Sequence, residues 1–450
     1  MTDLQAIEEK ALELVRLAEK AGADDCDVVV ARGDSLSVNV RDGKVENNKR
    51  SEGDSVSLRV FKDGQVASVD ANQIANLEQL AERAVAMAKV SPKDPYQGLA
   101  DKNLLSDAAT ITERAAMLDL YDDTLISVEE LTEKAMSAEA AGLSVKGVEK
   151  SMGASAGWGR NGFVLATSQG FSGSYERSGF SVSASLLAGE GTAMERDYDY
   201  DSAVHLEDLK EASKIGLAAG ERTVRRLSPK QVASGQYPII FEPRTSSGLL
   251  GSFIGAISGS SVARKTSFLR EQMNKTVANT AITILDDPHM KRKNGSKIFD
   301  GEGVDLEALD LVSAGTLNHW LLDCATAREL ELQTNGRAAR AGAGTTPSTT
   351  NCYMKPGTVS PQELYGGISD GLYVTETIGH GINMVTGDYS KGASGFWIEN
   401  GEIAYPVAGI TIAGNLKDMM MNATPASDLE FKYGTNAPTL LVEGMTVGGL

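Results

Sequence analysis

The segment at residues 237–261, YPIIFEPRTSSGLLGSFIGAISGSS, joins a short strand directly to an uncharged helix, and this order most constrains the fold. Residues 237–241 form an apolar run typical of a buried strand, which Pro243 ends. Thr245 or Ser246 is then expected to cap the helix, because Ser and Thr side chains can accept hydrogen bonds from its first N–H groups. The apolar residues that recur at helical spacing are Leu249, Leu250, Phe253, Ile254 and Ile257.

Four glycines recur along the same predicted helix, at Gly248, Gly251, Gly255 and Gly259. Each costs roughly 1 kcal/mol of helix stability relative to Ala. The pattern therefore indicates a need for close backbone approach or local irregularity. Helix packing is the favoured reason for the row Gly251, Gly255 and Gly259, and contact with a ligand is the alternative.

Four further motifs lie in the C-terminal third of the chain: TNCYMKPG at 350–357, GINMVTGD at 381–388, IENGEI with YPVAG at 398–409, and TLLVEGMTVGG at 439–449. Together with the strand–helix segment, they resemble the PmbA/TldD family of bacterial and archaeal peptidases. The resemblance covers most of the chain, and it points to the PmbA branch of the family, also called TldE.

The resemblance implies that the helix has lost a metal site. In the TldD branch this helix carries His-Glu-x-x-x-His, and the hexad falls here on residues 251–256, GSFIGA. Gly251 and Ala256 then stand where that branch has histidine, Ser252 stands where it has glutamate, and Gly255 lies between them. The branch also has a metal-binding cysteine in a glycine-rich loop before the closing strand, whereas residues 428–438 contain none. We therefore expect no catalytic residue and no metal ligand in this chain.

The chemistry of zinc leads to the same expectation for this helix. A catalytic zinc needs three ligands from His, Cys, Asp or Glu, an open position for water, and a carboxylate base nearby. Gly, Ser and Ala supply none of these groups. The histidines His205, His289, His319 and His380 lie tens of residues apart, so no two of them can pair on one helical turn. A site assembled from distant histidines stays open as an alternative.

Three other places in the sequence are candidates for chemistry. His380 lies between two glycines, and by the resemblance this stretch adjoins an interior cleft; we weigh a peptide contact against the favoured alternative, a satisfied loop histidine. His319 and Cys324 could supply a thiol nucleophile and its base, but core packing around HWLLDC explains both better. Asp286 and Asp287 could bind a cation, although the order DDPH favours a turn.

The charge balance excludes several classes of partner. The chain of 450 residues has a formal net charge of −18, which disfavours nucleic acid and anionic membrane surfaces because both present phosphate. Residues 245–263 carry no charge, yet seven of the nineteen are Ser or Thr, so a membrane span is poorly supported. The unpatterned cysteines Cys26, Cys324 and Cys352, together with an N-terminus unlike a signal peptide, favour the cytoplasm.

The predicted fold class is α+β, with an N-terminal antiparallel sheet and helices followed by a larger strand-rich C-terminal lobe. Two or three lobes are expected, because 450 residues exceed the size at which one hydrophobic core stops growing. We place an N-terminal α+β lobe at 1–100, a middle region of helices and Gly/Ser-rich strands at 101–230, and the strand-rich lobe at 231–450.

Local patterns support this division. Thr2 and Gln5 predict a capping box for a helix at 2–22, and Ser127 and Glu130 predict another at 128–141. Alternating residues at 27–41 and 54–70 predict an antiparallel meander with turns at 42–43 and 63–64. Strands at 147–187 are rich in Gly, Ser and Ala, which permits close backbone approach or leaves a shallow trough.

The resemblance implies a cytosolic assembly in which a TldD-type subunit brings zinc and this chain shapes a chamber for unfolded peptides, including peptide leaders. This chain would then form a heterodimer and lack catalysis of its own. Two alternatives stay open: a self-sufficient homodimeric metallopeptidase, and a non-proteolytic protein with a peptide-binding or regulatory role.

Overall fold

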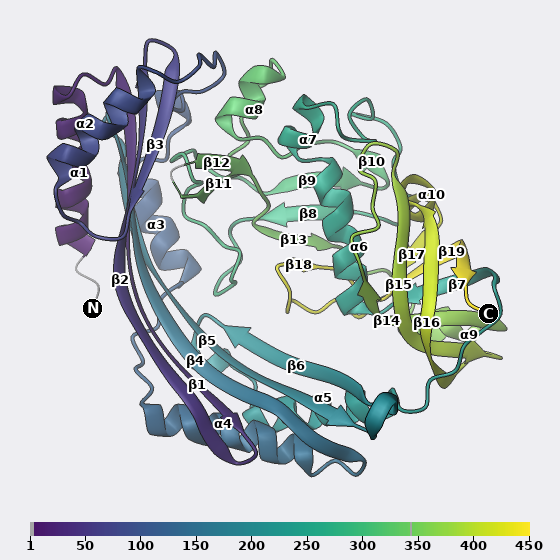
Figure 1. The fold of residues 1–450 in the computed structure, drawn as a ribbon. Coiled ribbons are helices and arrows are strands. Elements are labelled where there is room, and N and C mark those ends of the chain that lie inside the picture. Colours follow the sequence, from purple (N-terminus) through teal and green to yellow (C-terminus); the bar gives the residue numbers. More distant parts are fainter. Residues whose placement is uncertain (1–3, 343) are drawn as a thin grey trace.

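The computed structural model describes residues 4–342 and 344–450, and it has the predicted α+β class. A long, curved antiparallel sheet forms one side of the molecule, and a compact strand-rich part lies against the concave face of this sheet (Figure 1). No helix in the described residues is both long enough and apolar enough to cross a membrane.

The curved sheet has the strand order β3-β2-β1-β4-β5-β6 and is antiparallel throughout. The predicted turns at 42–43 and 63–64 are confirmed, because all four residues have positive φ, as two-residue hairpin turns require. Pairing of β1 with β4 joins the predicted N-terminal and middle regions in one sheet. Its strands are β1 (Asp25–Arg41), β2 (Lys44–Lys62), β3 (Gln65–Ala71), β4 (Val148–Thr167), β5 (Ser172–Ala188) and β6 (Glu195–Ala203).

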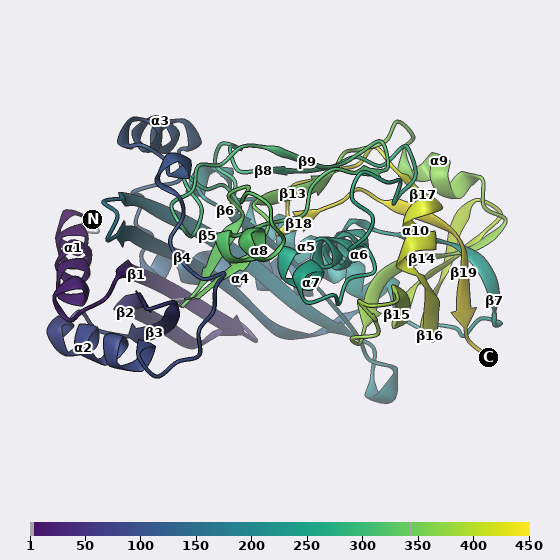
Figure 2. The same ribbon diagram turned by 90° about the horizontal axis from the view of Figure 1, so that it is seen from above.

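Four helices cover the convex face of this sheet, α1 and α2 at one end and α4 and α5 at the other (Figures 1 and 2). At Gly216 of α5 the backbones of α4 and α5 come so close that a Cβ would lie 1.8 Å from the carbonyl oxygen of Ala138. The helices of this half are α1 (Leu4–Lys20), α2 (Leu77–Ala88), α3 (Ala108–Leu118), α4 (Val128–Leu143) and α5 (Ala212–Arg225), with short 3₁₀ turns η1 (Lys102–Leu104), η2 (Gly191–Ala193) and η3 (Leu206–Asp208).

The two predicted capping boxes have different outcomes. Ser127 caps α4 by accepting a hydrogen bond from the backbone of Glu130, whose side chain bonds back to the Ser127 N–H, so this box is confirmed. Thr2 lies outside the described residues, so the other box stays a prediction. The helix predicted at 2–22 is present as α1 within the described residues, and its apolar stripe is buried against the sheet.

The C-terminal part contains a closed sheet of five strands. Its order is β16-β15-β14-β7-β19, β14 and β7 are parallel, and β16 also pairs with β19, so the strands close on themselves. We call this sheet the barrel; β17 adds to β19 outside the closure. The strands are β7 (Gly235–Phe241), β14 (Asp370–Ile378), β15 (Asp388–Glu399), β16 (Glu402–Asn415), β17 (Ala423–Pro425) and β19 (Leu440–Gly448).

In the described residues this part also has a five-stranded sheet, a hairpin and five helices, and the largest apolar core joins the five-stranded sheet, the barrel and α6. Figure 2 shows α6 between the curved sheet and the barrel. The sheet has the order β10-β9-β8-β13-β18. The elements are α6 (Pro243–Ala256), α7 (Gly259–Ala263), α8 (Cys324–Glu329), α9 (Pro361–Gly366), α10 (Leu416–Met421), β8 (Ile284–Asp287), β9 (Leu309–Ser313), β10 (Thr316–Leu317), β11 (Ala338–Ala341), β12 (Gly344–Pro347), β13 (Asn351–Met354) and β18 (Thr435–Asn436), of which β11 and β12 form a separate hairpin.

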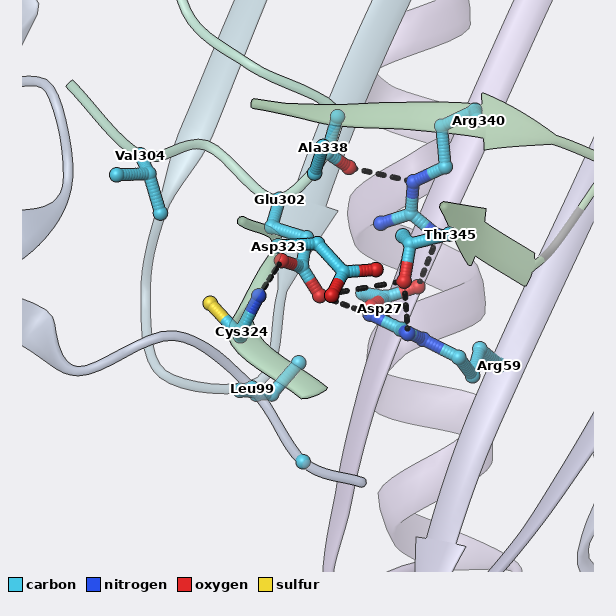
Figure 3. A network of polar contacts seen from close by, with 12 residues as sticks. Asp27, Arg59, Leu99, Glu302, Val304, Asp323, Cys324, Ala338, Arg340 and Thr345 are labelled. Atoms are coloured by element: carbon cyan, nitrogen blue, oxygen red, sulfur yellow. Dashed lines mark hydrogen bonds and ion pairs between the residues drawn. The ribbon is translucent and has the colours of Figure 1, made fainter. Parts of the chain in front are cut away.

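A buried ionic network connects the two parts of the molecule (Figure 3). Arg59 of β2 donates from Nη2 to Asp27 Oδ2 of β1 at 2.5 Å, and it lies 3.5 Å from Glu302 of the C-terminal part. Arg340 of β11 donates to the other oxygen of Asp27 at 2.9 Å. Burial alone would raise the pKa of Asp27, but the Arg340 and Arg59 guanidinium groups hold it below its usual value. Glu302 also accepts a hydrogen bond from the backbone N–H of Cys324 at the start of α8.

Replacing Arg59 with Met should destabilise the protein by about 3–5 kcal/mol, because the buried Glu302 carboxylate would lose its cation and Asp27 would keep Arg340 alone of its two arginines. The matched control is Arg50→Met on the same strand. Arg50 pairs with Asp34 at 3.3 Å while its side chain is 63% exposed, so its loss should cost less than about 1 kcal/mol. Urea unfolding of both variants measures the difference. Equal effects would show that the network does not stabilise the contact between the two parts.

Asp300 should make stability depend on pH. Burial and the neighbouring Glu302 carboxylate raise the pKa of Asp300 to about 7, against three backbone N–H donors that favour its charged form. The folded chain therefore keeps a proton that the unfolded chain loses near pH ~4, and this stabilisation disappears as pH rises through about 7. Unfolding free energies between pH ~5 and ~8 should decline more steeply for the wild type than for Asp300→Asn. Parallel pH profiles would contradict this assignment.

Candidate functional site

Helix α6 begins earlier than the sequence pattern predicts. Pro243 is its first residue, and Glu242 occupies the capping position. Proline is favoured at that first position because its missing N–H would have no partner there. The prediction that Thr245 or Ser246 caps the helix is therefore wrong. Their hydroxyls instead tie the helix to neighbouring backbone, since Thr245 donates to the Val374 carbonyl at 2.9 Å and Ser246 donates to the carbonyl at position 438 at 2.7 Å.

The hexad at 251–256 is split between an accessible face and the core. A Cβ at Gly251 would meet no atom within 4 Å, and at Gly255 it would touch the Met384 side chain alone. Ser252 is partly exposed and donates back to the carbonyl of the preceding turn at 2.9 Å. Ala256 is fully buried in the largest core. The accessible face of α6 therefore carries two glycines without side chains and the Ser252 hydroxyl. Ala256, the sixth residue of the hexad, faces packed side chains.

The two ends of the glycine row differ in their surroundings. Gly259 starts α7 rather than continuing α6, which corrects the prediction of one helix. A Cβ there would lie 2.7 Å from Thr326 Oγ1 and 2.8 Å from the Leu321 carbonyl oxygen, so close packing explains this glycine. Gly251 borders open space, so packing within the chain does not explain it.

A buried charge cluster surrounds the start of α6. Arg222 of α5 lies 3.2 Å from Glu242, and Arg244 pairs with Asp197 of β6 at 2.8 Å. Burial raises the pKa of Glu242, although the two arginines act in the opposite direction. Arg226 reaches Asp197 as well, at 3.5 Å. These contacts fix α6 against the edge of the curved sheet.

A cavity of about 1150 Å³ opens between β6 and the C-terminal part. It is lined by β6, by the loops at 291–295 and 348–351, and by residues 431–436, which include β18. Two acidic residues, Asp201 and Asp208, line it, against five cations. We call this space the basic cavity; its cations are Lys210, Lys291, Arg292, Lys293 and Lys432.

A shallow trough of about 330 Å³ continues from the basic cavity along the concave face of the curved sheet. One cross-strand row runs Ser37, Gly157, Ser181 and Ser202 on β1, β4, β5 and β6. Ser202 also lines the basic cavity, so the two spaces are continuous, and we call them together the groove. The trough predicted from the small residues at 147–187 is thus present, because their side chains leave this part of the face uncovered.

The histidines do not gather in the structure. His380 is exposed on the loop after β14, and its backbone carbonyl accepts from Ile382 N–H at 2.7 Å. It is not among the residues that line the groove. His205 Nε2 lies 2.8 Å from the Asp119 carbonyl oxygen, and His205 does not line the groove either. A peptide contact by His380 stays a prediction.

The remaining sequence candidates have structural explanations. Asp286 is fully buried and accepts from Arg337 Nε at 2.5 Å. Asp287 accepts from the backbone N–H of His289 at 2.8 Å, so the predicted turn is confirmed. Burial raises the pKa of the Cys324 thiol, which keeps it protonated and unreactive.

His319, by contrast, is exposed rather than part of the core, so the prediction that core packing explains it is wrong. Leu321, Leu322 and Cys324 of the segment HWLLDC are buried and Trp320 is half-buried, whereas this histidine is exposed directly before them.

Models of the PmbA/TldA metallopeptidase match the chain in three stretches: domain 1 at residues 26–88, the central domain at 121–227 and the C-terminal domain at 234–449. The Escherichia coli O157:H7 protein named metalloprotease PmbA is 34% identical over 432 residues, which cover 95% of this chain and 93% of that protein. The chain belongs to the PmbA/TldD metallopeptidase family.

Solved structures share the same fold. A crystal structure of a Bacteroides thetaiotaomicron protein has a TM-score of 0.90 and 27% identity, covering 98% of each chain. TldE from Thermococcus kodakarensis has a TM-score of 0.82 and 20% identity, covering 98% of this chain and 100% of that one. The family resemblance drawn from the C-terminal motifs is confirmed.

The residues of α6 do not fit the metal that the family name implies. Gly251, Ser252 and Ala256 carry no imidazole, thiolate or carboxylate, and Ala256 faces the core. Within residues 4–342 and 344–450, no group of three or more His, Cys, Asp or Glu side chains is placed to hold a metal ion. We therefore assign no metal-dependent catalytic step to α6 of this PmbA/TldD chain.

The basic cavity was not predicted from the sequence. Its cations come from residues 210, 291–293 and 432, which are far apart in the chain. The run Lys291-Arg292-Lys293 was the visible signal, because three consecutive cations are unusual in a chain of net charge −18.

Gly251→Ala should stabilise this chain by about 1 kcal/mol, because the new methyl group enters open space and Ala is the better helix former. Gly259→Ala should destabilise it by about 1–3 kcal/mol, since its Cβ would collide with backbone. Urea unfolding compares the pair. A loss of stability in Gly251→Ala would show that this face of α6 is covered in the isolated chain.

Proposed function

We propose that this chain is the non-catalytic subunit of a metallopeptidase complex and shapes the chamber through which unfolded peptides reach a TldD-type catalytic subunit. One observation carries the proposal: α6 keeps the strand-then-helix setting of a catalytic helix, while Gly251 and Ala256 stand at the positions of the two histidine ligands and Ser252 at that of the activating glutamate. Hydrolysis then depends on a zinc site in the partner, where the family pattern implies two histidines, a cysteine and an activating glutamate.

The open face of α6 and the groove support this role. A helix face with bare glycines leaves space in front of it rather than filling that space with side chains. The groove begins beside the loop that packs on α6, because Ala437 N–H donates to Ser247 Oγ at 3.1 Å directly after the residues that line the basic cavity. A peptide held in the groove would therefore lie near α6.

The unpaired edges of two strands at the basic cavity support a preference of this subunit for unfolded chains. β6 and β18 are the end strands of their sheets, and both line the basic cavity. An extended peptide can pair its backbone with such edges whatever its sequence, whereas a folded domain cannot enter. The proposed tasks are degradation of unfolded small proteins and removal of peptide leaders. Three free, buried cysteines support a reducing compartment such as the cytoplasm.

A mixture of this chain and a TldD-type subunit should cleave an unstructured peptide, while this chain alone should cleave none. Metal analysis of this chain alone should give far less than one zinc per molecule, because α6 supplies no ligand. The catalytic subunit alone and the mixture with a chelator are the controls. Stoichiometric zinc together with proteolysis by this chain alone would establish the homodimeric peptidase instead.

Filling the trough tests the chamber itself. Gly179 lines the trough and a Cβ there meets nothing within 4 Å, so Gly179→Phe should fold normally yet lower the activity of the mixture. Gly53→Phe is the matched control, since Gly53 lies in the same sheet, has the same open space and does not line the groove. Full activity of Gly179→Phe would contradict passage of peptide through the trough.

A further inference from the structure

The outer edge of β6 lies at the wall of the basic cavity and pairs with no other strand of the described chain. The N–H of Tyr198 bonds to Asp197 Oδ1 at 2.8 Å, and its carbonyl accepts from Arg244 at 3.0 Å, so neither group pairs with β5. Backbone groups of successive residues alternate in direction along an antiparallel ladder. Pairing of β5 with β6 has no register shift, so the N–H and C=O groups of Tyr200 and Ser202 also point away from β5.

The cations around this edge are not all neutralised. Arg292 pairs with Asp119 at 2.7 Å, and Lys432 pairs with Asp199. Within the described residues, Lys210 and Lys293 form no ion pair. Lys293 lies over the ring of Phe431, with its amine 5.5 Å from the ring centroid, which holds the amine at the cavity wall.

The position of this charge decides which peptides the edge would attract. The chain as a whole has a net charge of −18, so its surface repels acidic segments over most of its area. The cations of the basic cavity instead make the surface positively charged beside the outward backbone groups of Tyr200 and Ser202. A nucleic acid is a poorer fit, since its phosphates would continue past the cavity into the uncharged trough and the acidic surface beyond.

We infer that the outer edge of β6 binds an extended peptide segment rich in Asp and Glu, whose backbone pairs with Tyr200 and Ser202 and whose carboxylates meet Lys210 and Lys293. The edge supplies sequence-independent hydrogen bonds, and the two lysines supply the preference for acidic segments. The inference rests on the proposed function in one respect, because that function supplies unfolded peptide as the occupant.

The test is direct binding to the isolated full-length chain, which needs no catalytic partner. Three fluorescent peptides of about ten residues, enough to span β6, are compared by anisotropy: an unstructured Glu/Asp peptide, the same peptide with Lys at the acidic positions, and the acidic peptide with alternate backbone nitrogens methylated. We expect binding of the first alone. A single-stranded oligonucleotide of equal charge serves as competitor, and it should not displace the acidic peptide.

Charge reversal locates the site. Lys210→Glu with Lys293→Glu should weaken binding of the acidic peptide on the order of tenfold at low salt, and the variant should fold because neither lysine is in an ion pair. Lys214→Glu with Lys417→Glu, on exposed first turns of α5 and α10, makes the same charge change elsewhere and should leave affinity unchanged.

The inference is overturned by equal binding of acidic and basic peptides, by full affinity of the methylated peptide, by displacement with the oligonucleotide, or by no binding of the acidic peptide. These results are independent of proteolysis. If this chain binds the acidic peptide but its mixture with a TldD-type subunit cleaves no peptide, the proposed function is refuted. Peptide binding at the edge of β6 is then still established.

Discussion

The carboxylate of Asp27 is the constraint on which the arrangement of the molecule depends, because it is shared by arginines from both parts. Arg59 approaches it from the curved sheet and Arg340 from the hairpin of the C-terminal part. The strands β2, β1, β4, β5 and β6 are hydrogen-bonded in this order in one sheet. The position of the β2 end therefore also determines the position of the far edge at β6. At that far edge, the Arg244–Asp197 and Lys432–Asp199 pairs provide a second attachment.

These buried pairs set geometry more than they add stability. Removing a carboxylate and a guanidinium from water costs nearly as much as their attraction returns, so a well-packed apolar contact could hold the parts together equally well. An apolar contact, however, would not fix the direction of approach, whereas paired N–H donors and carboxylate oxygens do. Lys432 of the second attachment also lines the basic cavity, so this pair lies at the wall of the groove.

Features encoded by neighbouring residues were predictable. The apolar spacing from Leu249 to Ile257 located the core face of α6, and Ser127 with Glu130 located the start of α4. The start of α6 was misplaced because Pro243 was interpreted as the end of a strand, when a proline also opens a helix. The basic cavity was not predictable, since no local pattern brings residues 210, 291–293 and 432 together. These residues come together only when the chain folds.

The burial of Ala256 has a consequence for any attempt to restore enzymatic power to this chain. An imidazole is several times larger than a methyl group, and the space around position 256 is already filled by the main core. A histidine there would have to displace neighbouring side chains before it could approach an ion. Introducing His-Glu-x-x-x-His at residues 251–256 would therefore disrupt the core instead of creating a metal site. The side chains around position 256 would have to be redesigned at the same time.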